Sequence, residues 1–178
     1  MKYFIYLIAI IVVAGLNAGL FNNLQIRGQA PNFLLLLAVC FTLEKKDFDF
    51  FFVCFFCGLL LDFYSSGFFG GFTLAFLGIG LILHIFSGNF LVTELNWKTL
   101  SLVIALALAF LDFVLWLYGL AAFKFNWTYQ VIGFKVFAGS FIPALLYNLL
   151  LLYPAYLATV FVIRIVDNMD VRKRGVIR

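Results

Sequence analysis

Six apolar runs, separated by short polar segments, account for most of this 178-residue chain. The last two, at about 100–120 and 137–163, are long enough to cross the hydrocarbon core of a bilayer, which takes roughly 20 helical residues. Hydrophobic residues make up 66% of the chain and charged residues 11%, whereas a soluble domain has about 25% charged residues. A soluble globule of this size could not bury so much apolar surface in one core. The sequence therefore predicts an integral membrane protein.

The run lengths predict an all-α polytopic membrane protein, a six-transmembrane-helix bundle in one domain that covers residues 1–178. The expected helices span approximately 3–21, 31–43, 48–63, 68–86, 99–120 and 136–163, and a short basic cytoplasmic tail covers 164–178. The second and third runs are shorter than a full crossing. Either their ends extend through polar residues, or they form a hairpin that stops short of the far side.

The basic residues predict the orientation. A cytoplasmic N-terminus places most of them on the inside, namely Lys2, Lys45, Lys46, Lys98, Arg164, Arg172, Lys173, Arg174 and Arg178. The outside then receives Arg27, Lys124 and Lys135. This agrees with the positive-inside rule and predicts six crossings with both termini cytoplasmic. Because the basic tail directly follows an apolar run, we interpret it as a cytoplasmic anchor at the lipid surface, with no nucleic-acid partner.

Polar side chains inside the apolar runs are the candidate functional residues, because a carboxylate at the bilayer centre costs roughly 2.5–3.5 kcal/mol on insertion scales. Asp62 ends the third run just before Tyr64-Ser65-Ser66-Gly67. An aspartate readily accepts hydrogen bonds from nearby backbone amides, so we expect it to cap this turn. Gly67, Gly70 and Gly71 would supply the unusual backbone angles. The alternative is that Asp62 presents the turn to a periplasmic partner.

Asp112, in the fifth run, has no turn signal nearby. It is expected either to form a structural hydrogen bond across the bundle, for example to Asn148, or to serve partner binding or transport. Pro143 can kink the sixth helix and free a backbone carbonyl, which Asn148 could then meet. Asn17 is a further amide inside the first run.

Small residues four positions apart recur in the first run, where the pairs are Ala14 with Ala18 and Gly15 with Gly19. This spacing lets two helix backbones approach closely in lipid. It predicts helix packing, either within the bundle or against the helix of a partner.

The sequence lacks the residue sets of common enzymes and metal sites. Cys54 and Cys57 form a C-x-x-C pair inside an apolar run, with no second cysteine pair and with the single histidine, His84, distant in sequence. We therefore expect the cysteines to pack as small apolar side chains. No Ser/His/Asp or Cys/His grouping, phosphate-binding glycine loop or metal cluster is evident, so we expect no catalytic residues, no cofactor and no metal.

Three segments of the sequence carry a resemblance to a known family. They are Ala-Pro-Asn followed by leucines, from Ala30 to Leu37; the Gly58-Leu-Leu-Leu-Asp62 run with the later pair Gly70-Gly71; and the helix that holds Pro143 and Asn148. In this order they resemble the rod shape-determining protein MreD family of bacteria. Asn32 departs from it, because many members carry a charged or acidic residue after the proline.

The resemblance implies a non-enzymatic scaffold subunit of the elongasome in the bacterial inner membrane. Such a subunit would bind MreC and help couple MreB filaments to RodA and its penicillin-binding transpeptidase in lateral peptidoglycan synthesis. The resemblance also implies a helical core similar to the S-components of energy-coupling-factor transporters. A small-solute (vitamin) transporter subunit with Asp112 and Asn148 in a central pocket is therefore the alternative. An enzyme acting on lipid intermediates, with Asp62 as its essential group, is the third hypothesis.

Overall fold

The computed structural model describes residues 2–21, 30–45, 48–65, 69–89, 96–124 and 134–175, and these are almost entirely helical. The elements in chain order are α1 (Lys2–Leu16), a π-helical segment η1 (Asn17–Phe21), α2 (Phe33–Glu44), α3 (Asp49–Tyr64), α4 (Gly71–Asn89), α5 (Trp97–Lys124) and α6 (Phe134–Gly175). The all-helical prediction is confirmed for this part of the chain. Three helices contain stretches long and apolar enough to cross a membrane, at Lys2–Gly19, Trp97–Lys124 and Phe141–Met169.

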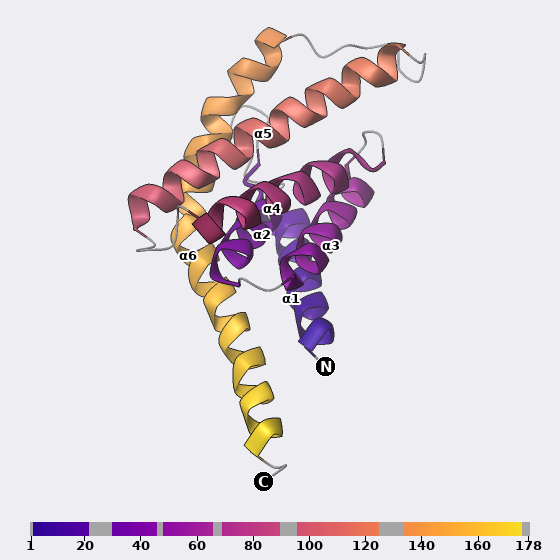
Figure 1. Ribbon diagram of the computed structural model, residues 1–178. Coiled ribbons are helices and arrows are strands. Elements are labelled where there is room, and N and C mark those ends of the chain that lie inside the picture. Colours follow the sequence, from indigo (N-terminus) through magenta and orange to yellow (C-terminus); the bar gives the residue numbers. More distant parts are fainter. Residues whose placement is uncertain are drawn as a thin grey trace.

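Helix α2 is the centre of the bundle. It is too short to span a bilayer by itself, yet every residue from Leu34 to Leu43 is buried. A helix that is apolar on all sides has no solvent face and belongs in an interior. Contacts with α1, α3, α4, α5 and α6 surround it, and Figure 1 shows it behind and between the other helices. The short second run is therefore the core around which the longer helices pack.

Successive helices run in alternating directions, and several polar contacts gather at the end of the bundle where α1 begins (Figure 1). Lys2 Nζ lies 2.9 Å from both carboxylate oxygens of Asp49, at the start of α3. At this end Lys45 also pairs with Asp167 of α6. Lys2 and Lys45, both of which the charge rule placed on the cytoplasmic side, thus lie at the same end of the bundle.

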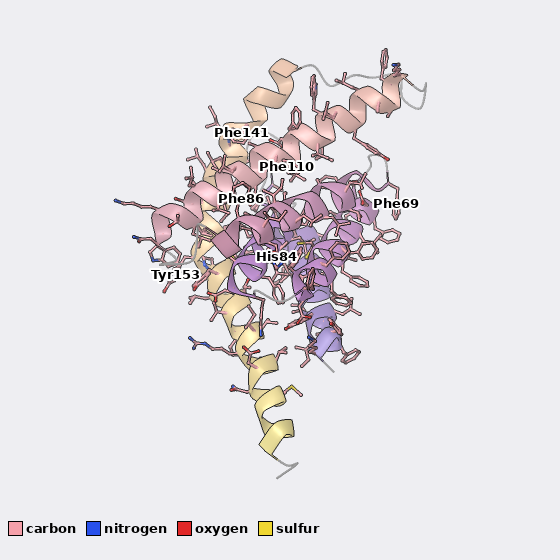
Figure 2. The ribbon with its side chains drawn as sticks, in the orientation of Figure 1. Phe69, His84, Phe86, Phe110, Phe141 and Tyr153 are labelled. Carbon is pink, nitrogen blue, oxygen red and sulfur yellow. The ribbon has the colours of Figure 1, made fainter. Side chains whose placement is uncertain are left out.

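The start of α5 packs on α6 near this same end. The ring centroid of Trp97 is 5.4 Å from that of Tyr153 and 5.7 Å from that of Tyr156, and Figure 2 shows Tyr153 beside the beginning of α5. The hydroxyl of Tyr156 donates to Glu44 at 2.7 Å, which ties α6 to the end of α2.

Helix α6 is longer than the sequence analysis expected. It has 42 residues, includes Pro143 and Pro154, and continues through 164–175, which had been assigned to a tail. At 1.5 Å per residue its length is about 63 Å, roughly twice the thickness of a hydrocarbon core. Figure 1 shows it passing the whole bundle and projecting beyond it at the end where the chain begins.

The cysteines pack as apolar side chains. All three are buried and free of disulfides. A Cβ atom placed on Gly80 of α4 would lie 2.7 Å from the sulfur of Cys54, so the pairing of a glycine with this thiol lets α3 and α4 approach closely. The described residues contain no group of histidine, cysteine or acidic side chains that could hold a metal ion.

Candidate functional site

Asp62 caps the beginning of the next helix. Its side chain is 3% exposed, and its two oxygens accept hydrogen bonds from the backbone N–H groups of Phe72 at 2.9 Å and Thr73 at 3.0 Å. The hydroxyl of Thr73 donates to the same carboxylate. Because α4 begins at Gly71, these are two of the N–H groups that lack partners within the helix. A carboxylate there also interacts favourably with the helix dipole.

The expected cap of the Tyr64–Gly67 turn lies largely outside the described residues, which leave out 66–68. Within them, the carboxylate of Asp62 binds amides ten and eleven residues ahead, across the turn. Its backbone carbonyl accepts from the hydroxyl of Ser65 at 3.4 Å. Gly67 lies outside the described residues. The N–H groups that this carboxylate binds lie at the start of a helix inside the protein, where no water could replace it as their acceptor.

Gly58 explains the spacing of the Gly58-x-x-x-Asp62 motif. The two residues are four apart, so they lie on the same face of α3. A Cβ atom on Gly58 would lie 2.6 Å from Cα of Thr73 and 3.0 Å from the carbonyl oxygen of Phe72. Both motif residues therefore meet the first turn of α4, where glycine permits the backbone approach and aspartate satisfies the amides that arrive there.

The turn before α4 is completed by glycine and by α5. Gly70 has a φ of +101°, which L side chains rarely adopt, and its carbonyl accepts from the N–H of Leu74 at 3.0 Å. Tyr118 of α5 donates its hydroxyl to the carbonyl of Phe69 at 3.0 Å. A Cβ on Gly71 would lie 3.4 Å from the side chains of Leu115 and Tyr118. These contacts fix the turn against α5.

A second cap lies at the start of α2, where three asparagines meet. Asn32 accepts from the N–H of Leu35 at 3.0 Å. Asn148 of α6 accepts from the N–H of Asn32 at 3.1 Å, and Asn17 of η1 accepts from the N–H of Phe33 at 3.3 Å. Each amide oxygen satisfies a different orphan donor. The start of the central helix is thus bound to both α1 and α6.

The expected hydrogen bond between Asp112 and Asn148 is wrong. Asn148 is 1% exposed and uses its side-chain N–H₂ group on the carbonyl of Ala144, at 2.7 Å. That carbonyl lies one residue after Pro143, so it differs from the one that the proline ring leaves free four residues upstream. Asp112 is partly buried on α5, and no ion pair or hydrogen bond joins its carboxylate to the part of the chain that the structure describes.

The small residues of α1 divide between two faces. Ala14 is buried in the core. Gly15 and Gly19 are exposed, and no described atom lies within 4 Å of a Cβ atom placed on either of them. Val12 and Leu16, 56% and 45% exposed, flank this surface. The surface around Gly15 of α1 is thus apolar and has no described atom close to it, whereas Ala14 packs inside the bundle; Gly19, in η1, makes a further interaction within the chain.

The sequence analysis missed the asparagine cap as a unit. Its signal was present, because Pro31-Asn32 directly before an apolar run is typical of a helix start. The contributions of Asn17 and Asn148 depend on tertiary contacts over 16 and 116 residues, which a local pattern does not carry. Thr73 was missed for the same reason.

Comparison with known proteins adds no assignment: no protein-family model, no curated protein and no solved structure matches the chain.

Proposed function

We propose that this chain is a non-enzymatic membrane scaffold that binds the single transmembrane helix of a partner on the face of α1 around Gly15. From the resemblance to the MreD family we infer that the partner is MreC and that the complex belongs to the elongasome of the bacterial inner membrane. In this role the chain would help couple MreB filaments to RodA and its penicillin-binding transpeptidase.

The observation that carries the proposal is the small-residue face of α1 around Gly15, which is exposed and has no described atom within 4 Å of an added Cβ atom. In lipid no hydrophobic effect drives helices together, so association depends on close packing, which small residues permit. Most other small residues on helix faces already pack within the chain, as at Gly58 and Gly80. A face of the same kind with no described neighbour supports a helix from another protein as its occupant.

The topology that goes with this role is six crossings with both termini cytoplasmic. It is supported by the alternating helix directions and by the grouping of Lys2 and Lys45 at the end where α6 also leaves the bundle.

The test is co-purification of MreC in mild detergent with Gly15→Leu and Gly19→Leu variants. Either leucine should fill the face and reduce recovery of MreC several-fold. Gly119→Leu is the matched control, because Gly119 on α5 also has no described atom within 4 Å of an added Cβ. Gly71→Leu is unsuitable, because its Cβ would press on Leu115 and Tyr118. Equal recovery of MreC with all variants would refute docking on α1.

A small-solute transporter subunit, similar in fold to an S-component, is the second candidate. It is favoured by Asp112, whose partly buried carboxylate has no partner among the described residues. Asn148 is less available for a ligand than the sequence implied, because it already binds Asn32 and Ala144. A screen of vitamins and metabolites for thermal stabilisation that is lost in Asp112→Ala would support this function, and no stabilisation by any of them would count against it.

A further inference from the structure

We propose that the seam between α1 and α6 binds one acyl chain of a membrane lipid. A cavity of about 190 Å³ lies in this seam. Its floor is formed by Phe33 and Leu37 of the central helix α2, and its walls include Val13 and Leu16 of α1.

On the α6 side, the residues that line the cavity have small side chains that do not cover it. These residues are Pro154, Ala155 and Ala158, and the first and last of them are exposed, as is Leu16 on the opposite wall. The cavity therefore opens sideways. Its mouth lies between two helices that contain membrane-spanning stretches, so the medium outside the mouth is hydrocarbon.

The lining excludes water and favours a hydrocarbon occupant. Every lining side chain is apolar, and an apolar cavity of about 150 Å³ in another protein stays dry and binds benzene. A water molecule needs two to four polar partners, which this cavity does not offer.

The volume of the cavity suits a narrow, flexible occupant, because about 190 Å³ is close to the roughly 150 Å³ of the apolar cavity that holds benzene. A flexible acyl chain is narrow enough to enter the space beside Leu37 without displacing α1 or α6.

The seam continues beyond this cavity in the direction of the N-terminus. A smaller cavity is lined by Ala9 of α1, by Thr159 and Val162 of α6, and again by Leu37. The hydroxyl of Thr159 donates to the carbonyl of Ala155 at 2.8 Å within its own helix, which leaves its methyl group for the seam. At about 10 Å³ this second cavity has room for at most about one water molecule, so the proposed acyl chain lies in the larger cavity alone.

The experiment uses the purified full-length chain without any partner, so its result is independent of the scaffold proposal. A phosphatidylcholine with a diazirine in the middle of one acyl chain is titrated into the detergent-solubilised protein and activated by light. We expect saturable labelling of about one lipid per chain, with the adduct mapped to the seam residues of α1 and α6. Labelling that does not saturate, or that maps elsewhere, overturns the proposal.

Two variants fill the seam from opposite walls, each with a matched control. Ala158→Phe is paired with Ala109→Phe, and Leu16→Trp is paired with Val12→Trp, because Ala109 and Val12 are exposed but do not line the cavity. The seam variants should lose at least fivefold of the labelling, and the controls should keep it. Equal labelling in all four overturns the proposal. If one seam variant does not fold, as judged by its thermal transition, the variant on the opposite wall and the position of the adduct in the wild-type chain still test the proposal.

Discussion

Replacement of Asp62 by alanine should destabilise the bundle more than any other single loss of a side-chain hydrogen bond in the described part of the chain. The variant leaves the N–H groups of Phe72 and Thr73 and the hydroxyl of Thr73 without their acceptor. A buried donor left unsatisfied costs about 1–3 kcal/mol, and loss of a helix cap costs about 0.5–2 kcal/mol. The cap figure covers the same two amides and is not added; at about 1–3 kcal/mol for each amide, the expected loss in the free energy of unfolding is about 2–6 kcal/mol.

Reversible unfolding in a titration with sodium dodecyl sulfate, followed by far-UV circular dichroism, measures this difference. Asp62→Asn keeps one acceptor oxygen but turns an amide N–H₂ group towards a backbone donor, so it should fall between alanine and wild type. A double-mutant cycle with Thr73→Val isolates the hydroxyl contact, for which we expect a coupling of about 1 kcal/mol. Asp112→Ala is the control, because that carboxylate accepts no hydrogen bond from the described residues. An Asp62→Ala variant within about 0.5 kcal/mol of wild type would refute the capping role.

Two further substitutions probe the same architecture in that unfolding assay. Gly58→Ala should cost about 1–3 kcal/mol in the free energy of unfolding through overpacking, because the new Cβ would lie 2.6 Å from Cα of Thr73. The control Gly119→Ala, where an added Cβ meets open space, should be within about 0.5 kcal/mol of wild type. Equal effects of the two substitutions would contradict close packing of α3 on α4. Asn148→Ala should cost about 1–3 kcal/mol in the free energy of unfolding, because it leaves the N–H of Asn32 unpaired. Asn148→Ser, whose hydroxyl is a shorter acceptor, should recover part of this loss. If neither variant lost stability, the start of α2 would not depend on α6.

The helical class was predictable from the sequence because it depends on run length and composition alone. The Gly58-x-x-x-Asp62 spacing places both residues on one helix face, since positions four apart share a face, but no joint role was predicted from it. The partner of Asp62 was not predictable. A carboxylate at a helix end can cap its own turn or the next helix, and only the packing of α3 on α4 decides between them.

The pairing of Asp112 with Asn148 failed for a related reason. The sequence shows that both residues lie in apolar runs, but the depth and facing of each depend on how the helices cross. At the start of α2, Asn148 accepts a hydrogen bond from the backbone N–H of Asn32, so its amide oxygen is satisfied without any contact with Asp112. The central place of α2 had a sequence signal, because its apolar residues show no helical period and a helix apolar on all sides is buried.

The polar groups inside the bundle satisfy the starts of its shorter apolar helices. In lipid the first N–H groups of such a helix cannot reach water. Asp62 satisfies these groups for α4, and the asparagines at 17, 32 and 148 satisfy them for α2. Asp112 lies in the middle of α5, whose internal amides are already bonded within the helix. The fold therefore accounts for Asp62 and the asparagines, but not for Asp112. A loss of function in Asp112→Ala at unchanged stability would consequently report a direct role in binding a ligand or partner.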